Sequence, residues 1–235
     1  IMGSPVTEAG RVSDETEHNV TLTQGFYLGR YEVTQVQYEA VMTGNPEGLN
    51  PKPSTWPNNN DRPVEKVSWE DAQIFLSRLN QMEQTAGRLP AGWKYVLPTE
   101  AQWEYACRAG TTTVFSWGNS ATSTQANFKG TEPYGGGASG PNLQQTADVG
   151  KYAANPWGFF DMHGNVWEWV HDWKADYPGV AQINPEGPAS GSSRVRRGGS
   201  WNLEGKYMRS ARRSYDSPSN RSPPLGFRLA FRQTS

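Results

Sequence analysis

Three segments of the chain combine a helix-starting signal with a helical spacing of apolar residues. Each segment begins with a Ser or Thr that can cap the first turn, followed three residues later by a side chain that can complete a capping box. These pairs are Thr34 with Gln37, Ser68 with Asp71, and Thr99 with Gln102. After the second pair, apolar residues stand at positions i, i+3, i+4 and i+7, which places one stripe against a core. They are Ala72, Phe75, Leu76 and Leu79.

The third helix is followed by a turn residue, and the rest of the chain alternates short extended runs with loops. Trp103 and Cys107 share one face of this helix, and Gly110 stands where a left-handed residue would stop it. The extended runs predict a small antiparallel sheet. They cover residues 19–22, 25–31, 94–97, 195–198 and 226–231. Residues 111–160 are too irregular for either element but too rich in aromatic residues for disorder, so we expect buried aromatic side chains and a bound cation to hold these loops.

Composition indicates one domain, 1–235, because the 235 residues contain no linker. The 25 Gly, 17 Pro and 10 Trp are typical of many turns around a few aromatic anchors, not of a helix bundle. No apolar run approaches the roughly 20 residues that span a bilayer, so we expect a soluble protein. The first residues carry no signal-peptide pattern, although a leader removed from this chain would leave export open. Cys107 is the single cysteine, which excludes an internal disulfide.

Charge is distributed unevenly, although the net charge is only -1. Residues 194–235 contain ten Lys or Arg against two acidic residues, so the preceding part of the chain carries an excess of acid. A segment this basic could hold an anion. The alternative is that its arginines bond loop carbonyls, and we favour that interpretation over a nucleic-acid partner.

Six motifs follow one another in a fixed order along the chain. They read GRYEVT (29–34), PVEKVSW (63–69), LPTEAQWEYA (97–106), DMHGNVWEW (161–169), RGGSW (197–201) and GFRL (226–229). Through these motifs the chain from residue 2 to 231 resembles formylglycine-generating enzymes and sulfatase-modifying factors. The resemblance implies an α+β, loop-rich fold of the C-type-lectin-like type, with small antiparallel sheets, about three helices and calcium-stabilised loops.

The resemblance also implies a chemistry that this sequence does not support. Members of the family oxidise a sulfatase cysteine to formylglycine, using copper held by two cysteines that follow the RGGSW motif. Here Leu203 stands at the first of these positions, and the second falls at Tyr207 or Met208. Cu(I) prefers soft thiolate ligands, which these residues do not offer. We therefore expect no bound copper and no catalytic residue.

Neither Cys107 nor the histidines offer a clear replacement. In related proteins the cysteine that matches Cys107 forms a structural disulfide, and the partner position here is Ser210, so Cys107 is interpreted as a small buried hydrophobic residue. His163, His171 and Asp172 could supply a two-histidine, one-carboxylate iron site. Their spacing matches no known helical pair of ligands, and the iron site remains an alternative.

Two calcium sites are implied by the resemblance, both in oxygen-rich loops that suit a cation with six to eight oxygen ligands. The first site would use the side chains of Asp161 and Glu168 and the carbonyls of Gly164 and Val166. The second would use Asn127, the carbonyl of Phe128, and Asn142 beside Pro141. Because Pro141 stands where the acidic ligand is expected, the second site depends on Asn142 shifting into place.

A groove beside the RGGSW motif is the expected binding site. Its floor would be Trp167, Ser200 and Trp201, and its walls would come from the loop between residues 202 and 225. The wall residues are Tyr207, Arg209, Arg212 and Tyr215. Planar and charged side chains in this mixture suit a peptide, glycan or protein ligand, so we expect a ligand-binding module. The alternative is that the same residues only hold a long loop in place.

Two other functions stay open. Some cysteine-less relatives act as oxidoreductases in natural-product pathways, so a metal-dependent oxidase in the same groove is the second hypothesis. Retroelement-diversified receptors vary the same C-terminal segment and give the third. Glu204, Lys206 and Met208 argue against such a receptor, because adenine mutagenesis of AAC codons cannot produce these residues.

Overall fold

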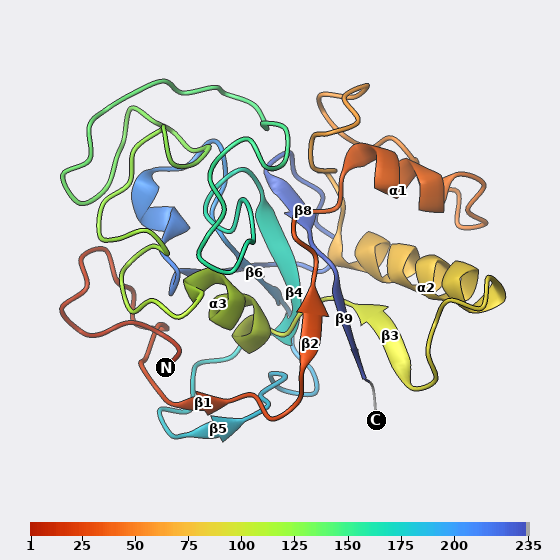
Figure 1. The fold of residues 1–235 in the computed structure, drawn as a ribbon, viewed down its shortest axis with the longest axis horizontal. Coiled ribbons are helices and arrows are strands. Elements are labelled where there is room, and N and C mark those ends of the chain that lie inside the picture. The colour runs from red at the N-terminus through yellow and green to blue at the C-terminus, as the bar shows by residue number, and fades with distance from the viewer. Residues whose placement is uncertain (234–235) are drawn as a thin grey trace.

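The computed structural model describes residues 1–233, which form three α-helices, a short 3-10 helix and nine strands joined by long irregular loops (Figure 1). The helices are α1 (Gln35–Met42), α2 (Trp69–Thr85), α3 (Glu100–Arg108) and the 3-10 helix η1 (Gly205–Met208). The strands are β1 (Val20–Thr21), β2 (Phe26–Leu28), β3 (Trp93–Val96), β4 (Trp167–Trp173), β5 (Gln182–Ile183), β6 (Arg194–Arg197), β7 (Arg213–Asp216), β8 (Leu225–Phe227) and β9 (Ala230–Gln233). This architecture confirms the predicted α+β class.

All three helices begin where the capping signals predict. Each N-cap side chain accepts a bond from the backbone N–H three residues later, and the side chain at that position bonds back to the N-cap backbone. Such caps contribute about 1 kcal/mol each. Along α2, Ala72, Phe75 and Leu76 are buried and Leu79 is partly buried, as the apolar stripe predicts. The C-cap of α3 is Ala109, which adopts the left-handed conformation (φ 48°) one residue before Gly110.

Three small sheets organise the strands, and their pairing is mixed. The strand orders are β1-β5, β2-β9-β3 and β7-β6-β4-β8. Antiparallel pairing was predicted throughout, but β1 with β5 and β4 with β8 pair in parallel. Parallel neighbours need a long connection between them, and the chain between β4 and β8 supplies one by first returning through β6 and β7.

Strand β4 lies at the centre of the molecule and was missed by the sequence analysis. It pairs with β6 on one side and β8 on the other (Figure 1). Trp169 packs with the core of α1 and α2, whereas Val170 packs with the core of α3. Because both faces of β4 are covered, its sequence lacks the alternation of apolar and polar residues that marks a half-exposed strand.

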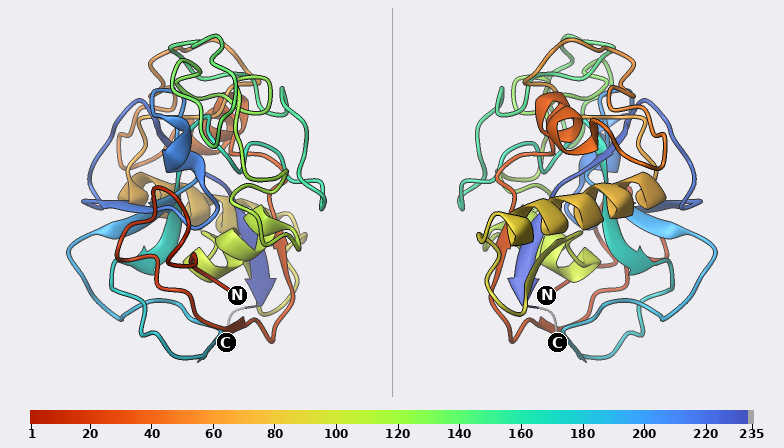
Figure 2. Two further views of the ribbon diagram at one scale, coloured as in Figure 1. Left: turned by 90° about the vertical axis from the view of Figure 1, so that its left-hand side faces the viewer. Right: turned by 90° about the vertical axis from the view of Figure 1, so that its right-hand side faces the viewer.

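The main core lies between the α1–α2 pair and the four-stranded sheet. Tyr38 stacks on Phe75 with ring centroids 5.5 Å apart, and Phe75 meets Phe227 edge-on at 5.3 Å. On the other side of the sheet, Trp103 of α3 and Val195 of β6 belong to a second buried cluster. The sheet is therefore packed on two faces, and side views show the helices and loops around it (Figure 2).

The predicted irregular stretch between α3 and β4 contains no helix and no regular strand. A third buried cluster holds these loops, and its members include Phe115, Phe128 and Met208. Met208 comes from η1, so the C-terminal loop and the central loops share one small core. Within residues 1–233, no helix is long and apolar enough to cross a membrane.

Candidate functional site

The loop after β6 turns sharply at two glycines to present the predicted groove residues. Gly198 and Gly199 have φ values of 98° and 76°, which L side chains rarely adopt. A Cβ on Gly199 would also lie 2.9 Å from the carbonyl oxygen of Tyr207. The backbone of η1 therefore packs directly on this turn, and only glycine allows that approach.

The positions that the resemblance assigns to the copper ligands lie in apolar surroundings in the structure. Leu203 and Tyr207 are partly buried and pack against the main core. Met208 is fully buried in the third cluster, beside Phe115 and Phe128. None of the three presents a thiolate to solvent or to another ligand. The donor set therefore does not fit a copper ion.

The predicted floor of the groove is only partly accessible. Trp167 and Ser200 are buried, and the Ser200 hydroxyl donates to Asn202 Oδ1 at 2.9 Å. Trp201 is half-buried and meets Trp56 edge-on, with ring centroids 5.2 Å apart. Its indole Nε1 has no hydrogen-bond partner within residues 1–233. Trp201 is thus the floor residue with an unused polar atom.

The predicted wall residues divide into one buried and three accessible side chains. Arg209 is fully buried, and it bonds Glu15 and the carbonyl of Gly10 in the N-terminal loop. Tyr207 is half-buried, and the guanidinium of Arg212 lies 5.1 Å from its ring centroid. Tyr215 is 52% exposed. The accessible part of the predicted site is therefore Trp201, Tyr207, Arg212 and Tyr215.

A small cavity opens beside the loop that carries Trp56. Its volume is about 180 Å³, and its lining includes Gln35, Glu39, Lys52 and Ser54. Gln35 holds this loop by donating a hydrogen bond to the carbonyl of Trp56 at 3.1 Å. The edge of the Trp201 site thus has both a planar surface and a polar recess.

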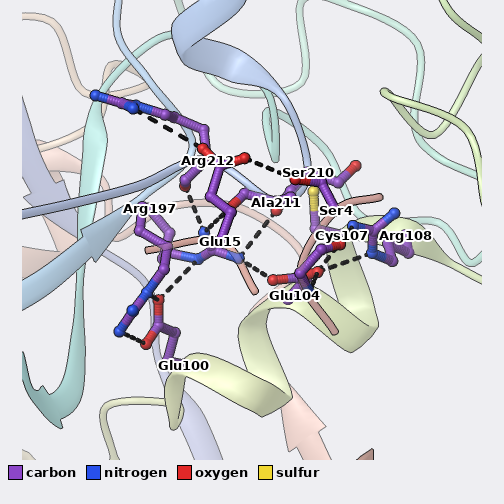
Figure 3. A network of polar contacts seen from close by, with 12 residues as sticks. Ser4, Glu15, Glu100, Glu104, Cys107, Arg108, Arg197, Ser210, Ala211 and Arg212 are labelled. Atoms are coloured by element: carbon purple, nitrogen blue, oxygen red, sulfur yellow. Dashed lines mark hydrogen bonds and ion pairs between the residues drawn. The ribbon is translucent and has the colours of Figure 1, made fainter. Parts of the chain in front are cut away.

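Four of the nine C-terminal arginines, Arg197, Arg209, Arg213 and Arg228, are buried against glutamates from earlier in the chain. The arginine–glutamate network consists of Glu15, Glu100, Glu104, Arg197, Arg209 and Arg213. Arg213 forms a bidentate pair with Glu100 at 2.7 and 2.8 Å, and Arg209 pairs with Glu15 at 2.7 Å. Arg197 pairs with Glu104 (Figure 3).

The same guanidinium groups also bond loop carbonyls, as the preferred interpretation of the basic segment states. Arg197 donates to the carbonyls of Ala211 and Ser210, both at 2.9 Å (Figure 3). Arg213 donates to the carbonyl of Asp14 at 3.0 Å. The charges of Arg197 and Arg213 are therefore used inside the fold, whereas Arg212 and Arg221 remain accessible.

A second group of buried charges surrounds the first predicted calcium site. The acidic cluster consists of Glu32, Asp161 and Glu168, all buried, and Arg228 is the neighbouring cation. Glu168 accepts two bonds from Arg228, at 2.6 and 2.7 Å, and one from Trp103 Nε1 at 2.7 Å. Both carboxylate oxygens of Glu168 therefore have hydrogen-bond donors.

The other two carboxyl groups of the cluster are less well satisfied. Asp161 Oδ2 accepts from the Gly150 N–H at 2.7 Å. Glu32 Oε1 accepts from Asn165 Nδ2 at 3.1 Å, whereas Glu32 Oε2 has no partner within residues 1–233. Burial raises the pKa of Asp161 to about 6, and burial together with Asp161 raises the pKa of Glu32 well above its usual value. Three carboxyl groups here share one guanidinium.

This excess of negative charge suits a cation, but carboxylates alone do not form the site. Within residues 1–233, no group of three His, Cys, Asp or Glu side chains is arranged to hold a metal ion. A calcium ion here would need backbone carbonyls, as the resemblance implies for Gly164 and Val166. The backbone at Gly164 is irregular (φ 89°), and a Cβ there would lie 2.4 Å from the carbonyl of Asn127.

The second predicted calcium site has one polar atom to spare. Asn127 is buried, its Nδ2 donates to the carbonyl of Gln145 at 2.9 Å, and its Oδ1 has no partner within residues 1–233. Phe128 is buried in the third cluster. Asn142 Oδ1 accepts from the Gln144 N–H at 3.2 Å, so its side chain serves its own turn. None of the predicted ligands of this second site is a carboxylate, so the acidic ligand expected at Pro141 has no replacement among them.

Asn165 connects the acidic cluster to the predicted groove. Its side chain bonds Glu32, and its backbone carbonyl accepts from the Trp201 N–H at 3.0 Å. Asn165 lies between the predicted calcium ligands Gly164 and Val166 in sequence. The position of Trp201 therefore depends directly on the segment that would hold calcium.

Within residues 1–233, His163, His171 and Asp172 do not gather into the alternative iron site. His163 is fully enclosed, with Nδ1 bonded to the Met208 carbonyl at 2.7 Å and Nε2 accepting from the Ser116 N–H at 3.2 Å. Burial lowers the pKa of His163 to about 4, so the ring is neutral and both nitrogens are used. Cys107 lies 3.6 Å from the same ring, and burial raises the pKa of its thiol to about 12. Cys107 is buried, as predicted, and its raised pKa disfavours the reactive thiolate.

A family model matches nearly the whole chain, and curated relatives match about four fifths of it. The family described as "Sulfatase-modifying factor enzyme 1-like domain" matches residues 2–233. A formylglycine-generating enzyme of Mus musculus is 36% identical over 196 residues, covering 79% of this chain and 48% of that protein. The chain thus spans about half the length of the curated relatives that it matches.

Two solved structures share the fold over nearly all of this chain. Treponema denticola variable protein 1 superposes with a TM-score of 0.79 at 29% identity, covering 99% of this chain and 91% of that chain. PvdO from Pseudomonas aeruginosa superposes with a TM-score of 0.79 at 27% identity, covering 99% of this chain and 90% of that chain.

Proposed function

Because the chain belongs to the family of sulfatase-modifying factor enzyme 1-like domains, we propose that it is a cysteine-less member that binds a peptide, glycan or protein ligand instead of oxidising cysteine. The observation that carries this proposal is the identity of the residues where family members hold copper. Leu203 and Tyr207 pack on the core, and Met208 is enclosed within it. A site without thiolates cannot hold Cu(I) in the way that the family's oxidation requires.

The proposed binding surface is the accessible part of the predicted groove, formed by Trp201, Tyr207, Arg212 and Tyr215. Half-buried aromatic rings supply contact area at low entropic cost, and aromatic residues and Arg are enriched at binding sites. The Nε1 of Trp201 is itself enclosed, so the contact that Trp201 offers a ligand is the exposed part of its ring. The loop that carries Trp56, which contacts Trp201, also lines the polar recess.

Calcium is proposed as a structural ion of the acidic cluster. The ligands would be Asp161, Glu168 and the carbonyls of Gly164 and Val166, with Glu32 adding negative charge nearby. The support is the unequal ratio of carboxyl groups to cations and the unpartnered Glu32 Oε2. Since Asn165 holds the backbone of Trp201, loss of calcium should also disturb the ligand surface. The second site, at Asn127, Phe128 and Asn142, is proposed only as a weaker site.

Measurements of oxygen uptake and of binding also test the two alternative functions, an oxidoreductase and a variable receptor. A relative named as a formylglycine-generating enzyme keeps the oxidoreductase hypothesis in view, and a neighbour named as a variable protein keeps the receptor hypothesis in view. Oxygen uptake on a cysteine-containing peptide would indicate an oxidase. Binding without oxygen uptake is what a recognition domain would give.

The binding proposal is tested by a fluorescent, cysteine-containing sulfatase peptide and a glycan array, each applied to the wild type and two matched variants. Trp201→Ala should weaken binding of any retained probe about tenfold, because central aromatic residues dominate such interfaces. Trp157→Ala is the control, since Trp157 is 45% exposed and packs against Tyr105 of α3, away from the groove. Equal losses in both variants, with both folded, would remove the groove from the proposal.

A further inference from the structure

A separate cavity lies at the N-terminal end of α3, under the loop that follows β4. Its volume is about 250 Å³, and its polar lining includes His18, Glu100, Asp172, Tyr177 and Glu186. None of the predicted groove or calcium residues contributes to it. The sequence analysis considered Asp172 only as an iron ligand.

Asp172 is the unusual side chain of this cavity. It is 5% exposed, and its Oδ2 accepts from the Glu100 N–H at the start of α3, at 2.7 Å. Its Oδ1 has no hydrogen bond within residues 1–233 and faces Gly187, where a Cβ would lie only 3.3 Å away. One oxygen of a buried carboxyl group therefore points at the cavity lining with no partner.

The other three carboxylates that line the cavity all have cations beside them. Glu100 pairs with Arg213 at 2.7 Å, Asp176 with Lys174 at 2.9 Å, and Glu186 with Arg232 at 2.7 Å. Asp172 forms no ion pair within residues 1–233, because none of their Lys or Arg nitrogens lies within 4 Å of it. The cavity is thus short of one cation, and the shortage is at Asp172.

One further polar atom of the cavity is open to a ligand. His18 Nδ1 lies 2.9 Å from the Thr16 carbonyl, so Nδ1 donates to that carbonyl and Nε2 is free to accept. The His18 ring packs on Tyr177 with centroids 4.6 Å apart. Tyr177 Oη is enclosed beside Glu100 and is closed to the cavity. Two acceptors, Asp172 Oδ1 and His18 Nε2, and three prolines, Pro178, Pro185 and Pro188, therefore line one small space.

We infer that this cavity binds a primary ammonium group, which donates N–H bonds to Asp172 Oδ1 and His18 Nε2, with its alkyl chain against the prolines. An ammonium carries three donors and no acceptor, so it can satisfy both acceptors and keep one N–H for water. It also supplies the cation that Asp172 lacks. The ammonium could belong to a free alkylamine or to a lysine side chain of a peptide, and both share this chemistry.

Binding would depend on pH because Asp172 must be ionised to accept the ammonium. Burial, then Glu100, raise the pKa of Asp172 to about 8. The charged groups that face it are Glu100 of α3, Arg213 of β7, Arg194 of β6 and Glu186 of the loop after β5. Affinity should therefore rise about tenfold per pH unit below pH 8, level off above it, and fall when the amine loses its own proton near about pH 10.

The test is titration of the protein with n-butylamine at several pH values, followed by amide NMR shifts of Glu100 and by calorimetry. n-Butanol and butyltrimethylammonium are matched probes that lack the charge or the N–H bonds, and neither should bind. Nα-acetyl-lysine amide separates the sources: binding of both amines assigns the site to lysine side chains, and binding of n-butylamine alone assigns it to free amines. No shift with either amine up to tens of millimolar at pH 8.5 would overturn the inference.

Three variants locate the site. Asp172→Asn keeps an acceptor for the Glu100 N–H, and it should weaken n-butylamine binding at least about tenfold and abolish the rise with pH. His18→Phe removes the ring acceptor and should weaken binding about threefold to tenfold. Asp176→Asn, on an exposed residue of the rim, should change affinity little. If Asp172→Asn does not fold, unchanged binding in His18→Phe would by itself contradict the assignment.

Discussion

Two groups of buried charges adjoin α3, one through Arg197 of β6 and the other through Glu168 of β4, and they differ in how completely they are neutralised. In the arginine–glutamate network, Arg197, Arg209 and Arg213 pair with Glu104, Glu15 and Glu100. In the acidic cluster, three carboxyl groups share Arg228, and Glu32 Oε2 has no partner within the part of the chain that the structure describes.

The difference shows how to separate a structural charge network from a site that is incomplete. Buried ion pairs roughly repay the cost of removing both charges from water, so a matched network can be complete without a ligand. A buried carboxylate with no counter-charge costs free energy that nothing in the protein returns. We therefore place the requirement for a cation at the acidic cluster and not at the network.

The largest expected effect comes from removing one arginine from each group. Arg197→Met leaves Glu104 without its buried partner, and Arg228→Met does the same to Glu168, so each should lower the free energy of unfolding by about 3 to 5 kcal/mol. Calcium should restore part of the loss in Arg228→Met, because the ion can replace the missing charge, and none of it in Arg197→Met. Urea unfolding with and without calcium measures both effects.

Arg88→Met is the control for that pair of variants. Arg88 forms an exposed ion pair with Glu83 at 2.6 Å, and such surface pairs contribute about 0 to 1 kcal/mol. Equal rescue of Arg197→Met and Arg228→Met by calcium would show that the ion acts elsewhere in the protein.

Removal of calcium should have the next largest effect. A ligand that binds only the folded state stabilises it by about 2.7 kcal/mol when its free concentration is a hundred times the dissociation constant. Chelation should therefore lower the melting temperature, and calcium but not magnesium should restore it, since Mg²⁺ demands a tighter octahedral geometry. Melting curves that do not change on chelation would remove the structural ion from our account.

A smaller and opposite effect is expected for Glu32→Gln. The amide keeps an oxygen that can accept from Asn165 but removes the negative charge of the unpartnered side. In chelator this variant should be as stable as the wild type or up to about 1 kcal/mol more stable, because a buried charge without a partner is gone. In calcium it should gain less from the ion than the wild type does. A loss of stability in chelator would mean that Glu32 is already satisfied.

The smallest effect concerns Cys107. Because burial raises the pKa of its thiol, the native protein should not react with a thiol-specific reagent, whereas the urea-unfolded protein should react with one equivalent. Cys107→Ala should cost about 1 kcal/mol as a small core truncation. Rapid labelling of the folded protein would show that the packing around His163 opens.

Local signals in the sequence were enough to predict the helices and most strands. The capping boxes at Thr34, Ser68 and Thr99 involve residues three apart, so they can be read directly from the sequence. Strand β4 was missed because both of its faces are buried, which removes the period-two pattern. The 226–231 run was predicted as one strand, but it divides into β8 and β9, which join different sheets.

Long-range partners explain what the sequence could not reveal about the site. Arg209 was expected at the surface of the groove, but it is enclosed by Glu8 and Glu15, which precede it by 201 and 194 residues. Glu32 was not recognised as part of the acidic cluster, because its bond to Asn165 spans 133 residues. Only the folded chain brings such groups together, although the motif that contains Glu32 was itself recognised.

The most direct test of the central claim, that this family member has lost copper-dependent oxidation, is oxygen uptake with a cysteine-containing sulfatase peptide. The purified protein is given copper and reductant, its bound metals are measured, and the mouse formylglycine-generating enzyme serves as the positive control. We predict no copper bound in proportion to protein and no oxygen uptake above the protein-free rate, because Leu203 and Met208 offer no thiolate. One copper per chain together with peptide oxidation would contradict the account.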